Sequence, residues 1–395
     1  MFRKSVFLVV CLAAVMLFVS ATESYASPAR LGGLNMTGHR AGFVRDYTNT
    51  YAYPVAINRY PNMVWVNMGH AGSGFEARHR VMGMFHELGE DGMHGILGVT
   101  LREDSPTDPI LQAMDLMGAS HQQFDLMYGR DMEQASFGLR FDMARSSFED
   151  SEGDTRAPDE TYIGLDEGYV NTWGIGAGVD VDINEDAMLE VGAEVRKYTF
   201  KDEGVVETIE DDGSISFRAN ARVFWERSET RTLIPMINFN RTKIGVEDGL
   251  ANTWTDFFLG AACNQVVNGD DLLIGGVAAR FQSMKVENGS VVMDESGRAV
   301  PVLFMAVEHR FRDWLVGRGG ASQAMAWDKD KSEEAGDETE MFSDFDFALG
   351  IAMEFSNFTI DATLNQNYPF TGFWFVSGEE TEDLFGMMSF TYTFD

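Results

Sequence analysis

The sequence predicts an all-β fold: a transmembrane antiparallel up-and-down β-barrel of about 16 strands, with about 14 as the alternative count. Three observations predict this fold. Apolar and polar residues alternate in one segment after another, the joints between these segments are short and long in turn, and the last segment carries a row of alternating aromatic residues. The first residues are also typical of an exported protein.

The N-terminus reads as a secretory signal peptide. Arg3 and Lys4 give a basic start, residues 6–19 form an apolar run, and the small-x-small sequence at 24–26 is a cleavage site. The apolar run is too short for a membrane-spanning helix, which needs ~20 residues. We therefore expect residues 1–26 to be a removable leader, and we find no later stretch that is apolar for long enough to span as a helix.

Composition excludes some classes of function. The 395-residue chain has a formal net charge of −32, whereas a nucleic-acid-binding protein needs a basic surface. No nucleic-acid partner is therefore expected. Cys263 is the only cysteine after the leader, so an intrachain disulfide is excluded, and we interpret this residue as a small packing residue.

Sixteen alternating segments read as strands, many of them near the ~10-residue length that a tilted membrane strand requires. The predicted strands are residues 62–70, 79–88, 92–103, 121–129, 134–145, 170–183, 187–200, 214–227, 231–244, 253–267, 271–286, 299–310, 313–327, 344–355, 358–366 and 383–394.

The hairpin at residues 345–364 raises the question of which medium each face meets. Phe347 and Ile351 lie on its apolar face, and Asp346 and Glu354 lie on its polar face. In a soluble β-sandwich the apolar face would pack on a second sheet. In an outer-membrane barrel the apolar face would meet lipid and the polar face would meet the lumen.

The joints favour the barrel. Every second joint is short, as at residues 184–186 and 356–357, which is the pattern of periplasmic turns alternating with external loops. A sandwich with Greek-key connections would scatter its long joints. The long joints are residues 104–120, 146–169, 287–298, 328–343 and 367–382. We therefore expect both termini in the periplasm and the apolar face of the hairpin in lipid.

The polar register is predicted to line a water-filled lumen. Inward carboxylates outnumber inward guanidinium groups, which predicts a preference for cations. The candidate lumen-lining residues are Arg140, Asp142, Asp180, Asp182, Glu190, Glu194, Arg196, Arg218, Arg222, Arg280, Glu308, Arg318, Asp346, Glu354 and Asp361. A basic ladder on the strands near residues 196–222 would face the acidic strands at 344–366. Such an arrangement would create a transverse field that orients polar or zwitterionic solutes.

The C-terminal segment resembles the assembly signal of outer-membrane proteins. Phe390, Tyr392 and Phe394 fall on one face of the last predicted strand. The signal usually ends on the aromatic residue, whereas Asp395 follows here, and Ser389 occupies a position often held by glycine. The resemblance implies that the barrel assembly machinery is a partner.

Residues 31–68 resemble the N-terminal segment of FadL-like outer-membrane proteins, where a Gly-rich stretch leads to an Asn-Pro-Ala element. The residues that carry the match are Gly32, Gly33, Asp46, Asn49, Pro54 and Ala56. Tyr53 stands where that family usually has Asn. The resemblance implies that residues 27–61 fold into the barrel as a hatch, that residues 62–395 form the barrel, and that the chain transports hydrophobic compounds.

No catalytic, cofactor or metal site is predicted. The histidines lack the helical spacing or cysteine partners of a metal site, and no GxSxG, HExxH or nucleotide loop is present. The acidic stretch at residues 328–340 fails the calcium-loop pattern at Glu333, where glycine is needed, and at Thr339. We interpret it as a solvated loop, and we expect no enzyme.

Together these features predict a channel in the outer membrane of a Gram-negative bacterium that passes small or hydrophobic solutes and prefers cations. The alternative is a structural or surface-interaction barrel with a blocked lumen. The expected partners are outer-membrane lipid, the assembly machinery and small-molecule solutes. The substrate and the oligomeric state are left open.

Overall fold

The computed structural model describes most of the chain between Ser27 and Phe394. The described residues are 27–70, 78–89, 92–104, 121–132, 135–149, 165–204, 208–246, 250–268, 271–288, 291–332, 336–364 and 385–394. The predicted leader at 1–26 and most of the predicted long joints at 104–120, 146–169 and 367–382 lie outside them.

Between Ser27 and the first strand lie four short helical turns. They are α2 (Pro28–Gly33), η1 (Gly38–Phe43), η2 (Tyr47–Tyr51) and η3 (Pro54–Arg59). The hydroxyl of Ser27 caps α2 by accepting a hydrogen bond from a backbone N–H of its first turn. Proline begins both α2 and η3, where its missing N–H leaves no helical hydrogen bond unmade.

Within the described residues, seventeen strands form one sheet. They are β1 (Met63–His70), β2 (Arg78–Glu87), β3 (Ile96–Asp104), β4 (His121–Met132), β5 (Ala135–Glu149), β6 (Leu165–Asn184), β7 (Ala187–Gly204), β8 (Thr208–Glu210), β9 (Ile215–Ser228), β10 (Arg231–Val246), β11 (Leu250–Val267), β12 (Asp271–Asn288), β13 (Val291–Arg312), β14 (Leu315–Ser332), β15 (Gly336–Phe355), β16 (Phe358–Leu364) and β17 (Phe385–Thr393).

The sheet is a closed up-and-down barrel. Neighbouring strands are antiparallel, and β1 pairs with both β2 and β17, so the first strand closes the sheet against the last. The short β8 pairs with the end of β7 and lies above the barrel wall. The other sixteen strands correspond one for one to the predicted strands, which confirms the predicted fold class.

Two predicted joints are wrong. Residues 287–298 and 328–343 were expected to be long loops, but β12 and β13 are separated only by residues 289–290, and β14 and β15 only by residues 333–335. These strands continue beyond the apolar belt, where polar and charged residues occur on both faces. The period-two hydrophobic signal that identifies a strand is lost there.

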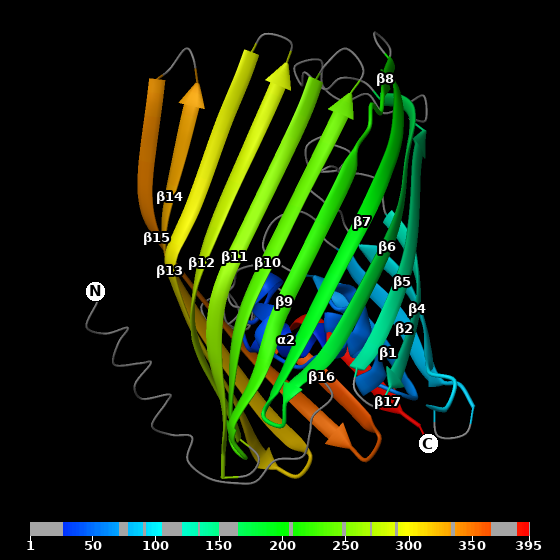
Figure 1. Ribbon diagram of the computed structural model, residues 1–395, viewed down its shortest axis with the longest axis vertical. Helices are drawn as coiled ribbons and strands as arrows, with labels where there is room; N and C mark the ends of the chain where they lie inside the picture. The colour runs from blue at the N-terminus through cyan, green and yellow to red at the C-terminus, as the bar shows by residue number, and fades with distance from the viewer. Residues whose placement is uncertain are drawn as a thin grey trace, which may run out of the picture.

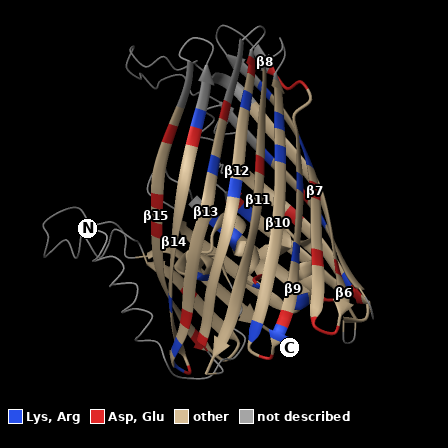
Figure 2. Cartoon of the chain, turned by 60° about the vertical axis from the view of Figure 1, so that its left-hand side comes forward, with Lys and Arg blue, Asp and Glu red and all other residues tan. Residues whose placement is uncertain are grey.

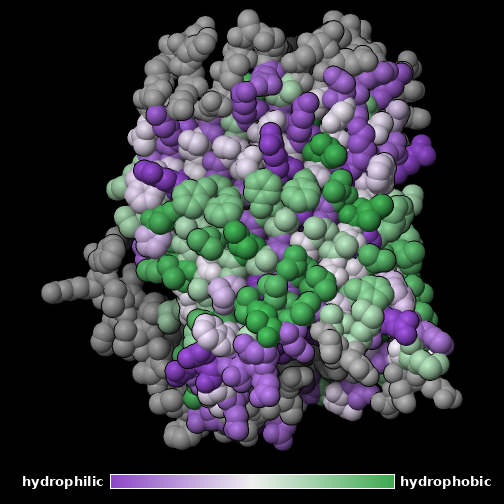
Figure 3. Space-filling view, in the orientation of Figure 1, coloured by the Kyte–Doolittle hydropathy of each residue, from purple (hydrophilic) through white to green (hydrophobic). Residues whose placement is uncertain are grey.

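The outer face carries a continuous apolar belt. Ile175, Leu303 and Phe345 point outward and are each more than half exposed. Figure 3 shows this belt in green between polar zones at the two ends of the barrel. Such a band is what a lipid bilayer requires of a barrel wall. None of the helices among the described residues is long and apolar enough to cross a membrane.

Residues 27–62, here called the inner segment, lie inside the barrel near the end that carries the short turns (Figure 1). The helix α2 contacts β14 to β17, η1 contacts β10 and β11, and η3 contacts β3 to β7. The segment therefore touches the wall on nearly all sides.

Candidate functional site

Part of the inner wall is apolar where the inner segment packs on it. Phe43 of the segment stacks on Phe304, with ring centroids 5.1 Å apart, and lies 6.1 Å from Phe258. One buried cluster contains Leu31, Leu34, Met36, Phe43, Val44, Phe224, Ile234, Met236, Phe258, Ala262, Ile274, Ala278, Phe304 and Ala306. On this side the lower lumen is filled like the core of a soluble protein.

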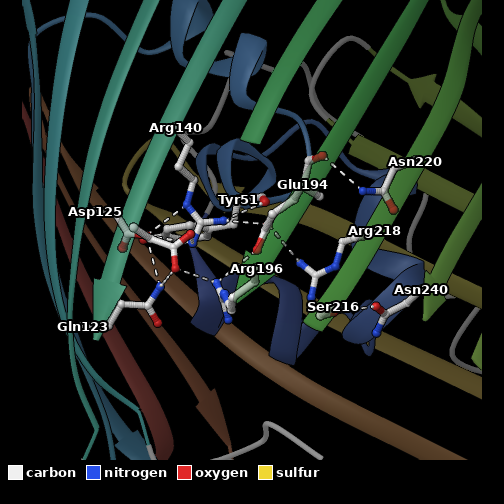
Figure 4. A network of polar contacts seen from close by, with 12 residues as sticks. Tyr51, Gln123, Asp125, Arg140, Glu194, Arg196, Ser216, Arg218, Asn220 and Asn240 are labelled. Carbon is white, nitrogen blue, oxygen red and sulfur yellow. Dashed lines mark hydrogen bonds and ion pairs between the residues drawn. The ribbon is translucent and has the colours of Figure 1, made fainter. Parts of the chain in front are cut away.

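A buried charge array joins the inner segment to β3–β7 (Figure 4). Asp125 accepts hydrogen bonds from Arg102 at 2.9 Å and from Arg140 at 2.7 Å. Arg140 also pairs with Glu194 at 3.1 Å. On the inner segment, Arg140 donates to the carbonyl oxygen of Tyr51 at 3.1 Å, and the guanidinium of Arg102 lies 4.4 Å from the Tyr51 ring centroid.

This first array extends toward the open part of the lumen through two further arginines. Arg196 pairs with Asp142 at 3.0 Å and with Glu194 at 3.1 Å. Arg218 lies 3.8 Å from Glu194, and its side chain is 40% exposed. Arg218 therefore has donor capacity facing water, whereas Asp142 is buried.

A second array is centred on Glu190, which is fully buried. Its carboxylate pairs with Arg222 of the wall at 2.7 Å and with Arg59 of the inner segment at 3.0 Å. Arg59 also pairs with Asp180 at 2.9 Å. Arg222 donates to the carbonyl oxygen of Gly42 at 2.5 Å, so each arginine bridges the wall and the inner segment.

A third array holds α2. Arg30 pairs with Glu308 at 2.8 Å, and Arg318 pairs with Glu308 at 2.5 Å. Arg318 also pairs with Asp361, which accepts a hydrogen bond from Ser27 at 2.7 Å. Buried charges are tolerated when they are paired in this way, and removal of one partner is costly.

The predicted lumen-lining residues all lie on inward-facing positions of the wall, but in different surroundings. Those buried beneath the inner segment are Arg140, Asp142, Glu190, Glu194, Arg222, Glu308, Arg318 and Asp361. Those that are half-buried are Asp180, Arg196, Arg218, Arg280, Asp346 and Glu354, and Asp182 is exposed beside a short turn. The structure thus differs from the expected water-filled lumen at the buried positions, because the inner segment covers them.

The hatch-like motif residues occupy close contacts within the inner segment or with the wall. A Cβ on Gly33 would lie 2.8 Å from the Cα of Gly350, and Gly32 is similarly close to Thr363. Asn49 donates to the carbonyl oxygen of Val44 at 2.7 Å. Pro54 and Ala56 are buried, Pro54 against Gly138 of β5.

Asp46 is the buried acid of the inner segment. One carboxylate oxygen accepts hydrogen bonds from the backbone N–H and the hydroxyl of Thr48, at 2.7 and 2.6 Å. The other oxygen has no hydrogen-bond partner among the residues that the structure describes. Burial raises the pKa of Asp46 to about 6 because desolvation outweighs these hydrogen bonds. Burial also raises the pKa of Tyr51 and of Tyr53 to about 12.

A cavity of about 740 Å³, here called the vestibule, lies between the inner segment and the inward faces of β9–β15. Its floor includes His39, Arg40 and Tyr53 of the inner segment. The vestibule residues of β12 to β15 lie in the parts of these strands that are away from the short turns. It is large enough for a small solute.

The walls of the vestibule differ in charge. Three amides and two arginines line it from β9, β10 and β12: Asn220, Asn238, Asn240, Arg218 and Arg280. The register pairs Asn220 with Asn238 and Arg218 with Asn240, so donors of neighbouring strands lie side by side. From β14 and β15, Asp328 and Asp344 line the cavity. The vestibule is therefore polar, with basic and acidic groups on separate strands.

His39 connects the vestibule floor to the wall. Its Nε2 lies 2.9 Å from the Asp256 carboxylate, which also pairs with Arg280 at 2.6 Å. Its ring stacks on Phe258 at 5.0 Å, and its Nδ1 lies 3.3 Å from the amide nitrogen of Asn238. This contact was not predicted. The alternation along the strand predicts that Asn238 points inward, but nothing in the sequence linked it to His39.

The predicted assembly aromatics lie at the seam. Tyr392 points outward and is 48% exposed, and Phe390 stacks on Phe358 at 6.4 Å. Phe394 stacks on His86 at 6.0 Å, and its N–H donates to the carbonyl oxygen of Asn62. Their role in assembly stays a prediction. Within the described part of the chain, no three His, Cys, Asp or Glu side chains are grouped closely enough to hold a metal ion.

Comparison with known proteins finds likeness in structure alone. No family model matches the sequence, and no curated protein matches it. A Pseudomonas aeruginosa FadL homologue shows 14% identity and a TM-score of 0.43, over 96% of this chain and 99% of that one.

Two larger Acinetobacter baumannii proteins are also similar. BauA, the ferric preacinetobactin receptor, shows 10% identity and a TM-score of 0.47, over 76% of this chain and 53% of its own. CdiB shows 10% identity and a TM-score of 0.43, over 84% of this chain and 60% of its own. This chain thus spans little more than half the length of either protein. Likeness at this distance carries no argument about the function of this chain.

Proposed function

We propose that this chain is a channel in the outer membrane of a Gram-negative bacterium, and that the inner segment is a gated plug beneath a vestibule for small polar solutes. The observation that carries the proposal is the position of the 740 Å³ vestibule directly above a segment that three arrays of ion pairs join to the wall. Ion pairs can exchange partners or take up water when the inner segment moves. The hydrogen-bonded strands of the barrel wall, by contrast, stay in place. Passage would then require displacement of residues 27–62.

A preference for cations is part of the proposal. At the vestibule mouth, the register places Asp328 directly opposite Glu340, and Asp344 follows Glu340 by four residues on the same face of β15. Like charges in direct opposition repel each other, and a passing cation relieves that repulsion. Arg280, by contrast, is neutralised by Asp256. These acids should attract cations at the entrance, while Arg218 and the amides offer donors deeper in the vestibule.

Planar-bilayer recording tests the channel proposal. The wild-type protein should show low or intermittent conductance, and deletion of residues 31–58 should raise it. Reversal potentials under a salt gradient should favour cations, and the preference should weaken as salt screens the wall charges. Asp328→Asn with Asp344→Asn should reduce the preference, whereas Glu229→Gln, in an exposed short turn, should leave it unchanged. An anion-selective pore would overturn the proposed selectivity.

A structural barrel with a blocked lumen is the second candidate. The apolar cluster around Phe43 favours it, because the contact between inner segment and wall is there as well packed as a protein core. No conductance in either the wild-type or the deleted protein, with both proteins folded, would support this candidate over the channel.

A further inference from the structure

A second cavity lies on the outer face of the barrel, away from the vestibule. It is a groove of about 560 Å³ over β1–β5. Outward side chains line it, among them Met82, Leu101 and Met143, each about half exposed. A groove of this size can hold the acyl chains of a bound lipid.

The strand register arranges these side chains in two adjacent rows. The apolar row runs across five strands in direct pairing: Val66, Met82, Leu101, Phe124 and Met143. On β2 to β5 the polar row lies two residues further along each strand toward the long joints: Arg80, Glu103, Gln122 and Arg145. On β1 the corresponding position is Met68, which pairs with Arg80. The boundary between apolar and charged surface is therefore sharp and falls within the groove.

The polar row has spare hydrogen-bond donors. Arg80 contacts Glu103 at 3.2 Å through one nitrogen, and its side chain is 57% exposed. Arg145 is exposed and pairs with no acid among the residues that the structure describes. A guanidinium group binds phosphate with two parallel hydrogen bonds. The row carries two positive charges against one negative charge, in a chain of net charge −32.

We propose that this groove binds a phosphorylated glycolipid of the membrane leaflet nearer the long joints, with its acyl chains on the apolar row and its phosphates at Arg80 and Arg145. The two arginines are three strands apart, a separation of roughly 14 Å at the usual strand spacing. A disaccharide with a phosphate at each end has this reach, and Glu103 and Gln122 lie between as partners for its hydroxyl groups. The flexible Met82 and Met143 side chains can adapt to several acyl chains.

The inference rests on the proposed membrane location and orientation, but not on transport. Figure 2 shows further Lys and Arg bands high on β10, so the basic boundary is not confined to the groove. Over β1–β5 the Arg positions of this boundary border a cavity.

The test is lipid binding by the full-length protein in detergent, followed by native mass spectrometry. The probes are a hexa-acylated glucosamine disaccharide with two phosphates, the same lipid without phosphates, and phosphatidylglycerol. We expect the wild-type protein to retain the phosphorylated glycolipid best. Arg80→Gln with Arg145→Gln should weaken that binding at least about tenfold, through loss of the charge-assisted hydrogen bonds.

The matched control is Arg227→Gln with Arg231→Gln, two exposed arginines beside the short turn at the other end of the barrel. It should bind like the wild-type protein. Equal binding of the phosphorylated and dephosphorylated lipids, equal binding of phosphatidylglycerol, or wild-type affinity in the Arg80/Arg145 variant would each overturn the inference. Heat-modifiable gel mobility verifies that the variants are folded. Bilayer conductance of the Arg80/Arg145 variant should equal that of the wild-type protein, so that a loss of lipid binding can be distinguished from a loss of channel activity.

Discussion

Glu190 shows how a single side chain can join the inner segment to the barrel wall. It is fully buried between Arg59 of the segment and Arg222 of β9. Glutamine at this position would keep the shape but remove the charge that both guanidinium groups face. We expect Glu190→Gln to lower the free energy of unfolding by ~3–5 kcal/mol. The shift of the midpoint at which the folded gel band is lost on urea titration would measure this.

The control for this change is Glu103→Gln. It breaks a pair with Arg80 that is largely exposed, and such pairs contribute ~0–1 kcal/mol. A Glu190→Gln protein that unfolds at the same urea concentration as the Glu103→Gln protein would contradict a stabilising role of the second array.

Asp46 should make the stability of the inner segment depend on pH. Its pKa is about 6 in the folded protein and 3.8 when unperturbed, so the folded state binds the proton more tightly. The free energy of unfolding contributed by this group is therefore highest below pH 4 and falls as the pH rises to about 6, by an amount of order 1–3 kcal/mol. Asp46→Asn cannot ionise but still accepts hydrogen bonds from Thr48.

The measurement is the difference in urea stability between Asp46→Asn and the wild-type protein at pH values from 4 to 7. We expect the variant to gain relative stability as the pH rises through this range, with no further change above about pH 7. A difference that is constant across the range would show that Asp46 is already ionised at low pH in the folded protein.

At the scale of elements, the contact of α2 with β14 and β15 depends on glycine. A Cβ on Gly320 would lie 1.8 Å from the carbonyl oxygen of Leu34, so the inner segment must move to admit it. We expect Gly320→Ala to loosen the segment and raise bilayer conductance while the barrel stays closed. Gly275→Ala is the matched control, because a Cβ there meets nothing within 4 Å. Equal conductance in the two variants would show that this contact does not hold the plug.

The sixteen barrel strands were predictable because each has one face in the apolar belt, which gives a period-two signal. Their continuation beyond the belt, as at Lys329 and Glu340, was not predictable because polar and charged residues occur on both faces there and the alternation is lost. The apolar inner wall was missed for the opposite reason. Phe257 points outward and Phe258 inward beneath His39, so both faces are apolar and the alternation disappears.

The candidate site was predictable only in part. The inward parity of Glu190, Glu308 and Asp361 followed from alternation, but their partners on the inner segment did not. Arg30 and Arg59 lie in a segment with no regular period, and their contacts cross more than a hundred residues of sequence. Only a closed barrel brings such residues together, and no local pattern records that closure.

At the scale of the whole molecule, the orientation in the membrane can be tested by labelling. Single cysteines can be introduced in a Cys263→Ser background. Position 212 is exposed at the end of the barrel that carries the long joints, and position 229 is exposed in a short turn at the other end. We expect a membrane-impermeant maleimide to label Asp212→Cys on intact cells. Glu229→Cys should react only after the outer membrane is permeabilised. The reverse pattern would invert the proposed topology.

The seam between β1 and β17 sets an order of events during synthesis. The inner segment continues directly into β1, and its helix α2 rests against β14 to β17, the strands that leave the ribosome last. Ser27 and its partner Asp361 are 334 positions apart. Contacts of such high sequence separation form slowly. Neither the barrel nor its contents can therefore be completed on a nascent chain, and a chain interrupted before residue 361 would emerge with its N-terminal helix lacking the surface on which it docks.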